Sequence, residues 1–281
     1  MPHDSAIERV TLVTSEKANR FSRRLISLTQ SMPRNWFGQQ LAQLARKLVL
    51  GIADLPIRCQ VDGLNFEFHI SDNNSEKKYG FMPWRFDLVE RNMLVKAMPK
   101  DAVFVDIGAN VGIYTLYVAS HLGAGGRVIS FEPNPSAYQR LSTNVALNEA
   151  TLSADISLLQ LGVSDKDEIV ELYLDDGNLG SSSLVMESGN QTRIECKPLL
   201  SVLQSQGVEQ IHGLKIDIEG AEDMALTPFL QQAPTSLLPR WIVIENSDHL
   251  WKTDLTTLIL ASGFCLRHKS RMNSVYEYAQ D

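Results

Sequence analysis

The spacing of apolar residues predicts a helix and a hairpin in the first 75 residues. Residues 58–70 alternate apolar and polar positions around Asp62-Gly63, a dipeptide that favours tight hairpin turns. Residues 73–78 are polar, and we expect a loop there. Five apolar residues follow the i, i+3, i+4, i+7, i+8 spacing of an amphipathic helix: Leu41, Leu44, Ala45, Leu48 and Val49. Residues 1–75 are therefore interpreted as an N-terminal helical and hairpin extension.

After residue 76, short apolar segments alternate with helical patterns. Strands are predicted at residues 103–105, 128–131, 156–161, 214–218 and 241–245. Helices are predicted at residues 87–98, 111–122, from Pro135 with Asn134 as N-cap, and at 254–262. Residues 169–174 and 192–196 are expected to form extra strands, and 264–268 and 274–278 a closing antiparallel hairpin. This order predicts an α/β fold over residues 76–281, a doubly wound, seven-stranded, mostly parallel sheet with helices on both faces.

The helix predicted at residues 87–98 has a short apolar stripe. Val89, Met93 and Ala97 lie at helical spacing, and we expect them to face the core. Asp87 and Glu90 have the spacing of a capping box, which predicts the start of the helix.

Composition narrows the class of protein. The chain has 281 residues, of which 44% are hydrophobic and 21% charged, so a packed core is expected. The net charge of −7 argues against general nucleic-acid binding, which needs a basic surface. The cysteines, Cys59, Cys196 and Cys265, have no metal-ligand spacing. No signal-peptide pattern is present, and the longest apolar stretch, residues 48–52, is too short to span a bilayer, so we expect a cytoplasmic protein without a membrane span.

The charge is distributed unevenly along the chain. Residues 1–50 carry eight Lys and Arg against three Asp and Glu, whereas the remainder has a net charge of −12. A basic amphipathic N-terminus can lie on a membrane surface or a nucleic acid, or can be a solvated helix face packed on an acidic body. The absence of a dense basic run favours the solvated face.

Candidate chemistry begins at the end of the strand at residues 103–105. There a buried strand ends in Asp106, and the glycines Gly108 and Gly112 flank the turn that opens the next helix. In sheets of this kind, ligands bind at the carboxyl ends of the strands, near the switch point. The next strand ends in Glu132, 26 residues after Asp106, where an acid can accept hydrogen bonds from the two hydroxyls of a ribose. Together these features indicate a ligand that contains adenosine.

A nicotinamide dinucleotide is the competing ligand. Its fingerprint is G-x-G-x-x-G, in which the second glycine lets the backbone reach a pyrophosphate. Asn110 occupies that position here. A side chain there disfavours a dinucleotide and suits a ligand without phosphate, such as S-adenosylmethionine.

Four motifs resemble those of the FkbM-type methyltransferases, over roughly residues 80–250. They are Asp106–Gly112 (DIGANVG), Phe131–Asn134 (FEPN), Leu214–Glu222 (LKIDIEGAE) and Gly180–Leu184 (GSSSL). The resemblance implies the Rossmann-like class I methyltransferase fold, S-adenosylmethionine as methyl donor, and O-methylation of a hydroxyl on a sugar or natural product.

The resemblance also implies which residues bind the donor. Glu132 would hold the ribose, and Val163 and Ser164 would border the adenine. Asn134 would either add a contact or only cap its helix. The amino-acid part of the donor would be bordered by Asp106, Gly108, Asn110 and Gly112, with Asp217 also near the donor.

The catalytic candidates follow the strands at residues 214–218 and 241–245. Asp217 and Glu219 come at the end of the first of these, beside the transferable methyl group in a class I sheet. Asp217 is expected to orient or deprotonate an acceptor hydroxyl, because a free alcohol is a poor nucleophile at neutral pH. The alternative is that the two acids cap the following helix or hold Lys215. Glu245 and His249 are further candidates, with His249 either a base or structural.

A metal ion is a second way to activate the hydroxyl. Asp217, Glu245 and Asn246 offer oxygen ligands at neighbouring strand ends, which suits Mg²⁺. The sequence thus predicts a methyltransferase acting on a small-molecule or saccharide acceptor, with an NAD-linked oxidoreductase or a non-catalytic adenosyl-binding module as alternatives. Residues 1–75 would cover the acceptor pocket, form a homodimer or dock on a carrier protein.

Overall fold

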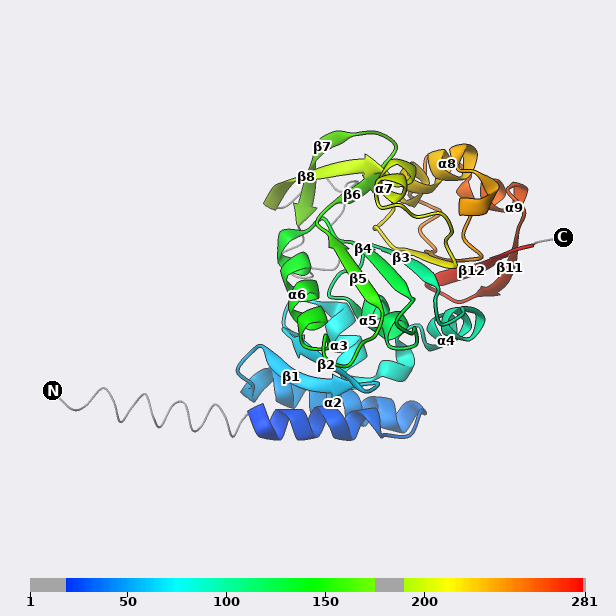
Figure 1. The fold of residues 1–281 in the computed structure, drawn as a ribbon. Helices are drawn as coiled ribbons and strands as arrows, with labels where there is room; N and C mark the ends of the chain where they lie inside the picture. The colour runs from blue at the N-terminus through cyan, green and yellow to red at the C-terminus, as the bar shows by residue number, and fades with distance from the viewer. Residues whose placement is uncertain (1–18, 175–189, 280–281) are drawn as a thin grey trace. The chain divides into compact units, whose positions relative to one another are not determined.

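The computed structural model describes residues 19–174 and 190–279, and the chain divides into two compact units, Met1–Leu88 and Val89–Asp281. The first unit contains helical residues 19–30, then α2 (Trp36–Ile52), the strands β1 (Ile57–Val61) and β2 (Leu64–Phe68), α3 (Asn74–Phe81) and a 3₁₀ turn, η1 (Pro83–Arg85) (Figure 1). The predicted hairpin is confirmed, because β1 and β2 pair in antiparallel register about a turn in which Asp62 and Gly63 both have positive φ. Residue 75 lies inside α3 of this unit.

Helix α2 buries a different face from the one that the leucines suggest. Its N-cap is Asn35, whose side chain accepts a hydrogen bond from the Gly38 amide at 3.0 Å. Small residues form the buried face, at i, i+4, i+7 and i+11: Gly38, Ala42, Ala45 and Val49. The helix was predicted correctly, but Leu41, Leu44 and Leu48 are exposed.

The prediction of a loop at residues 73–78 is wrong, because α3 begins there. The side chain of Asn73 caps the helix by accepting hydrogen bonds from the amides of Ser75 and Glu76. Tyr79 and Phe81, in the last turn, are fully buried. The apolar residues that hold the helix lie only at its end, so its polar first turn gave no helical pattern.

The second unit is built on a seven-stranded sheet in the order β11-β12-β10-β9-β3-β4-β5, which confirms the predicted fold class. The five consecutive strands β10, β9, β3, β4 and β5 are parallel, and β12 and β11 are antiparallel additions at the β10 edge. The strands are β3 (Val103–Ile107), β4 (Arg127–Phe131), β5 (Asp155–Leu159), β9 (Gly213–Ile216), β10 (Trp241–Glu245), β11 (Phe264–Lys269) and β12 (Asn273–Tyr278).

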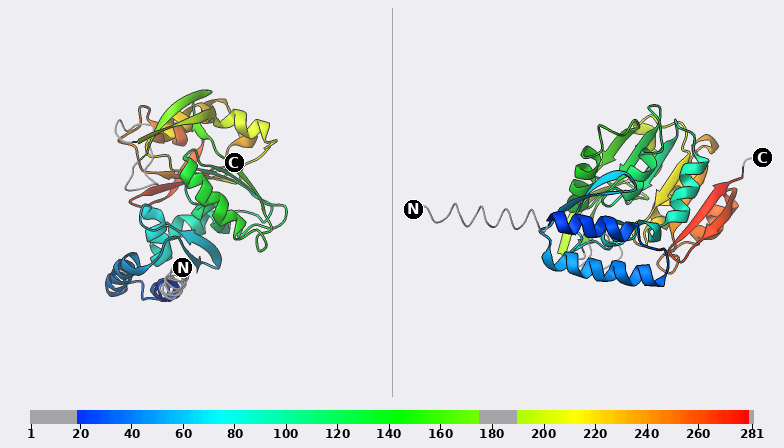
Figure 2. Two further views of the ribbon diagram at one scale, coloured as in Figure 1. Left: turned by 90° about the vertical axis from the view of Figure 1, so that its left-hand side faces the viewer. Right: turned by 90° about the horizontal axis from the view of Figure 1, so that it is seen from below.

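Helices cover both faces of this sheet (Figures 1 and 2). Apolar residues of α7 (Leu199–Ser205), α8 (Glu222–Gln232) and α9 (Leu255–Ala261) form one core cluster with alternate residues of the strands, such as Val105 and Ile107. Helix α5 (Ile113–Ala119) packs on β3 and β4, and every one of its residues is buried. Helix α6 (Pro135–Ala146) begins at its predicted N-cap, Asn134. A separate three-stranded sheet is formed by β6 (Gly162–Ser164), β8 (Asn190–Pro198) and β7 (Glu168–Leu174).

The apolar stripe predicted for residues 87–98 is wrong, although the helix exists as α4 (Leu88–Ala97). Val89 is 51% exposed, and the buried residues are Glu90, Arg91 and Leu94. The Arg91 guanidinium stacks 4.2 Å from the ring centroid of Tyr117, so a cation–π contact takes the place of the expected apolar stripe. Among the residues that the structure describes, no helix combines the length and apolarity that crossing a bilayer requires.

The turn after β3 lies at the switch point of the sheet, because β3 has β4 on one side and β9 on the other. Gly108 in this turn has φ +74°, and a Cβ there would overlap the carbonyl oxygen of Asp217 in the segment after β9. The glycine is therefore required by the close approach of two backbone segments. Gly112 has φ +89°, and its Cβ would lie 2.6 Å from Leu141 of α6.

Gly108→Ala is expected to lower the free energy of unfolding by about 3 kcal/mol or more, because left-handed strain and steric overlap add together. Gly207→Ala is the matched control in the same unit, since Gly207 has φ +65° and nothing within 4 Å of an added Cβ. Its cost should be about 1–2 kcal/mol, from strain alone. Urea unfolding of both variants measures the difference, and equal losses would contradict the close approach.

Candidate active site

A buried polar row crosses the middle of the sheet beneath α5. Asp106 of β3 is in register with Ser130 of β4 on one side and with Lys215 of β9 on the other, so all three side chains leave the same face. All three are nearly inaccessible to solvent. Thr115 of α5 donates to Asp106 Oδ2 at 2.6 Å and lies 2.8 Å from Ser130 Oγ. The row fixes helix α5 to the sheet by hydrogen bonds as well as by packing.

Lys215 connects this row to the turn at the switch point. Its Nζ donates to the carbonyl oxygen of Gly108 at 2.7 Å. The same nitrogen lies 3.8 Å from Asp106 Oδ1 and 3.5 Å from Asp217 Oδ2. Burial raises the pKa of Asp106, whereas Lys215 and the hydrogen bond from Thr115 lower it. One buried ammonium group thus holds the ends of β3 and β9 together.

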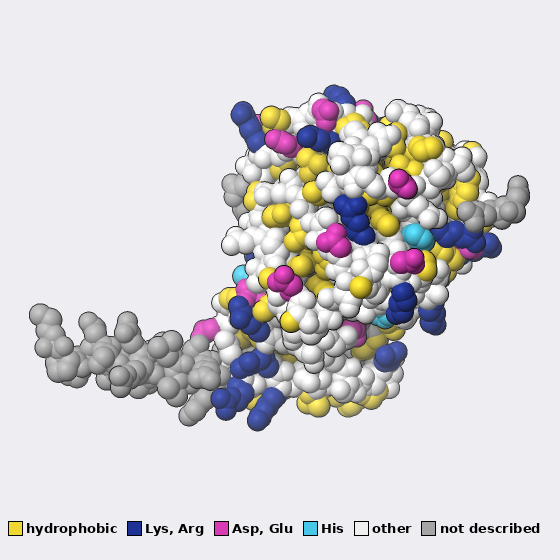
Figure 3. Space-filling model, in the orientation of Figure 1, with side chains coloured by type: hydrophobic (Ala, Val, Ile, Leu, Met, Phe, Trp, Pro, Cys, Tyr) yellow, Lys and Arg dark blue, Asp and Glu magenta, His cyan; other side chains and the backbone are white. Residues whose placement is uncertain are grey.

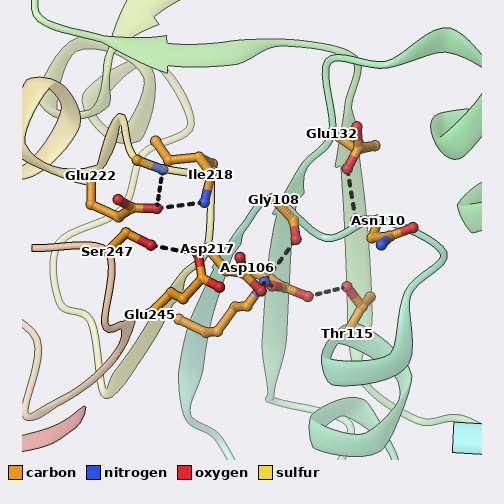
Figure 4. Close-up of polar contacts among 12 residues, drawn as sticks. Asp106, Gly108, Asn110, Thr115, Glu132, Asp217, Ile218, Glu222, Glu245 and Ser247 are labelled. Carbon is orange, nitrogen blue, oxygen red and sulfur yellow. Dashed lines mark hydrogen bonds and ion pairs between the residues drawn. The ribbon is translucent and has the colours of Figure 1, made fainter. Parts of the chain in front are cut away.

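Three of the four predicted catalytic residues, Asp217, Glu219 and Glu245, lie close together at or just after the ends of β9 and β10. Asp217 and Glu245 point toward each other in Figure 4. Burial, and then the charges of Asp217 and Glu219, raise the pKa of Glu245 to about 8, although a hydrogen bond from Ser247 opposes this. Burial, and then Asp217 and Glu222, raise the pKa of Glu219 to about 7. The arrangement brings together carboxyl groups whose pKa values are raised toward and above neutral pH.

Glu222 fixes the backbone of this acidic segment. Its Oε1 accepts hydrogen bonds from the amides of Ile218 at 2.8 Å and Gly220 at 3.3 Å (Figure 4). Its Oε2 accepts one from Trp251 Nε1 at 2.7 Å. Glu219, between these two amides, has φ +54°, a left-handed conformation that is uncommon for a residue other than glycine. The contacts of Glu222 hold Glu219 in this conformation.

Glu132 lies at the end of β4, and both of its carboxylate oxygens are held by backbone amides. Oε2 accepts from the amide of Asn110 at 2.7 Å, and Oε1 accepts from the amide of Asn134 at 2.9 Å. The side chain is only 7% exposed, and burial raises its pKa to about 7 against the lowering effect of the two amides. Asn110, which donates one of these amides, has φ +52° in the left-handed region. The β3 turn and the β4 end are therefore joined at this carboxylate.

The remaining predicted donor-site residues that the structure describes are buried. Asn134 is 1% exposed, and its side-chain oxygen caps α6 by accepting from the amides of Ser136 and Ala137. Val163 and Ser164 are in β6, are 3% and 1% exposed, and Ser164 donates to Asp165 and Glu168. The Gly180–Leu184 motif lies outside the described residues.

His249 and Asn246 do not take part in the carboxylate cluster. His249 is exposed in the segment after β10. The Asn246 amide nitrogen donates to the carbonyl of Ser270 at 3.1 Å, and its oxygen accepts from Ser274 Oγ at 2.7 Å. No grouping of three or more His, Cys, Asp or Glu side chains within residues 19–174 and 190–279 is arranged to hold a metal ion. The predicted magnesium ligands Asp217, Glu245 and Asn246 are therefore not supported, because the oxygen of Asn246 already serves the β10–β12 contact.

The sheet has five parallel strands, a glycine turn after β3 at the switch point, and an antiparallel hairpin, β11 and β12, added at one edge. This is the fold of the class I methyltransferases. The model of the FkbM methyltransferase domain matches residues 106–260, which is more than half of the chain. The chain belongs to the FkbM methyltransferase family.

Individual proteins resemble the chain over shorter spans. Methyltransferase sdnD of Sordaria araneosa is 31% identical over 156 residues; the match covers 44% of this chain and 59% of sdnD. The AMB antimetabolite synthetase AmbE of Pseudomonas aeruginosa is 26% identical over 234 residues; the match covers 69% of this chain and 10% of AmbE. The chain thus spans less than two thirds of either protein. The crystal structure of methyltransferase FkbM from Methylobacillus flagellatus is 19% identical, with a TM-score of 0.45, over 96% of this chain and 60% of that one.

The residues that support the site were missed from the sequence. Thr115, Ser130 and Glu222 were not named as parts of the site, and Lys215 only as a possible partner of Asp217 and Glu219, although these residues hold Asp106, Gly108 and Glu219 in place. One signal was present, since β3, β4 and β9 each carry one buried polar residue among apolar ones. Their alignment into a row depends on the register between strands, which the pattern within each strand does not specify.

Replacing the buried ammonium group tests its structural role. Lys215→Met should lower the free energy of unfolding by about 3–5 kcal/mol, because Asp106 keeps a buried charge without a counter-charge. Adding Asp106→Asn to Lys215→Met should recover part of the loss, since it removes that charge. Lys166→Met is the control, because Lys166 forms an exposed pair with Glu168 at 3.2 Å, and it should leave the unfolding midpoint unchanged. No recovery in the double variant would contradict the coupling.

The raised pKa of Glu245 predicts a pH-dependent effect of Glu245→Gln. The folded protein resists ionisation of this carboxyl group, so its favourable contribution is present below the ordinary pKa near 4.5 and is lost as the pH rises through about 8. At pH 9 the variant should therefore melt about 3 °C or more above the wild type. At pH 5 the difference should largely vanish. Thermal melts across this range measure it, with exposed Glu195→Gln as control; a constant difference at every pH would refute the assignment.

Proposed function

We propose that the chain transfers a methyl group from S-adenosylmethionine to a hydroxyl oxygen of a small molecule or saccharide. Membership of the FkbM methyltransferase family supports the transfer of a methyl group. The observation that supports the donor is the carboxylate of Glu132, which is nearly buried at the carboxyl end of a parallel strand, next to the switch point.

The geometry of Glu132 fits two ribose hydroxyls. Each carboxylate oxygen accepts one backbone hydrogen bond, which leaves it a lone pair for a second donor. The two amides come from the β3 turn and the start of α6, so the carboxylate keeps one orientation. Gly108 and Asn110 would border the rest of the donor along the same turn. Asp106 would contribute indirectly, because its carboxylate pairs with Lys215, whose ammonium group donates to the carbonyl oxygen of Gly108.

S-adenosylmethionine supplies the methyl group on a positively charged sulfur that leaves as a neutral thioether. The residues of this chain must then align the acceptor oxygen and take its proton. Glu245 and Glu219 suit that task, because a base works best when its pKa lies near the working pH. Asp217, whose side chain is 40% exposed and whose charge faces Lys215, would orient the hydroxyl. His249 remains a candidate base on sequence grounds only.

Glu132→Gln tests the donor site. The wild type should bind S-adenosylhomocysteine in calorimetry, and the variant should bind it roughly ten- to a hundredfold more weakly, because charge-assisted hydrogen bonds to the ribose are lost. Exposed Glu195→Gln should bind as the wild type does. Far-ultraviolet circular dichroism and a melting curve of each variant separate lost binding from lost folding.

Two results would contradict the proposal. The first is binding of NAD but not of S-adenosylhomocysteine by the wild type. The second is binding of the donor without transfer of a tritium-labelled methyl group to any acceptor in a collection of hydroxylated small molecules and saccharides, which would leave an adenosyl-binding module. Mass spectrometry of a labelled product then shows whether the methyl group is on oxygen.

A further inference from the structure

The first unit presents a row of large apolar side chains to solvent. Five residues of α2 recur at i, i+4, i+7, i+11 and i+15, so they lie along one side of the helix. Each is more than a third exposed: Phe37 60%, Leu41 37%, Leu44 56%, Leu48 50% and Ile52 45%. A continuous apolar stripe of this kind marks an interaction surface, whereas single exposed leucines do not.

The neighbouring helix extends this surface. Residues 19–30 are helical and lie side by side with α2, as the view from below in Figure 2 shows. Phe21 and Leu28 on that helix are 52% and 57% exposed. Trp36, at the start of α2, is 71% exposed. We name this set the apolar stripe: Phe21, Leu28, Trp36, Phe37, Leu41, Leu44, Leu48 and Ile52.

The charges around the apolar stripe have one sign. Residues 19–53 contain six Lys and Arg and no Asp or Glu, although the whole chain has a net charge of −7. Arg24 follows Phe21 by three positions and precedes Leu28 by four, so it shares their side of the helix. Lys47 likewise follows Leu44 by three positions. Figure 3 shows hydrophobic side chains along the lower margin, with Lys and Arg side chains beside them.

From this combination we propose that the apolar stripe docks on an anionic lipid surface, with both helices lying in the plane of the headgroups. Apolar side chains enter the acyl boundary, and the flanking cations meet lipid phosphates and carboxylates. Trp36 suits the boundary, since an indole ring is apolar at one end and donates a hydrogen bond at the other. The proposal concerns a part of the chain separate from the donor site.

The charges of residues 19–53 disfavour a second copy of the chain as the binding partner of this surface. Two copies joined through this surface would bring the same six cations of each together, and residues 19–53 offer no acid to pair with them. Like charges without partners at an interface are unfavourable, whereas an anionic bilayer neutralises them. A nucleic acid would neutralise the cations but would leave the apolar residues without a partner.

Sedimentation with lipid vesicles tests the proposal on the full chain without methyl donor. The protein should pellet with phosphatidylcholine vesicles that contain phosphatidylserine, and far less with phosphatidylcholine alone. Leu44→Gln combined with Leu48→Gln should reduce binding more than about tenfold. The two leucine side chains would no longer contribute their free energy of transfer from water into the acyl boundary. Arg24→Gln combined with Lys47→Gln should reduce it roughly thirtyfold, because each removes one cation beside the stripe.

The matched control replaces apolar residues of similar exposure in the second unit. Leu260 and Leu266 are both 47% exposed, and changing both to Gln should leave vesicle binding unaltered. Fluorescence gives a second readout, since contact with vesicles should shift the emission of the wild type to shorter wavelength but not that of Trp36→Phe. Melting curves show that each variant is folded.

Three outcomes overturn the proposal. One is the absence of binding to vesicles of either composition. Another is equal binding to both compositions, since the cations would then have no role. The third is a dimer in light scattering that the Leu44 and Leu48 changes convert to monomer, which would assign the surface to self-association. None of these outcomes bears on binding of S-adenosylhomocysteine, so the two proposals fail independently.

Discussion

The buried ammonium group of Lys215 is the contact on which the centre of the second unit depends. It donates to Gly108 and lies within ion-pair distance of both Asp106 and Asp217. A buried carboxylate without such a partner is strongly unfavourable, and a buried lysine without an acid is equally so. Each charge therefore offsets the desolvation cost of its partner. Together the contacts fix the distance between the β3 turn and the end of β9.

The carboxyl groups after β9 and β10 show the opposite balance. Glu219 and Glu245 are partly buried next to other acids, and their pKa values are raised to about 7 and about 8. This arrangement costs stability when the groups ionise, and it is maintained by neighbouring contacts such as those of Glu222. Perturbed acids of this kind concentrate at functional sites, where stability is given up for reactivity. The proposed proton acceptors, Glu219 and Glu245, are therefore carboxyl groups whose ionisation the surrounding structure disfavours.

The first unit illustrates how a helical pattern can be predicted and its buried face still be assigned wrongly. The spacing of Leu41, Leu44 and Leu48 predicted α2, but small residues such as Ala42 and Ala45 form its buried side. Small side chains allow two helices to approach closely, and the larger ones then face outward. Hydrophobicity alone ranks leucine above alanine, so the pattern could not show which side the rest of the unit would cover.

The sequence by itself determined the class of fold and the positions of the candidate site residues along the chain. Strand and helix periodicity gave the parallel sheet and its closing hairpin, and motifs at strand ends marked Asp106, Glu132, Asp217 and Glu245, because those signals are local in the chain. Only the tertiary structure decided that Lys215 pairs with both Asp106 and Asp217. It also decided that the side-chain oxygen of Asn246 accepts a hydrogen bond from Ser274, and that the close approach of the Asp217 carbonyl oxygen leaves no room for a Cβ at Gly108. These facts depend on strand register and on the approach of segments about a hundred residues apart (roughly the β3 to β9 separation), which the pattern within each segment does not encode.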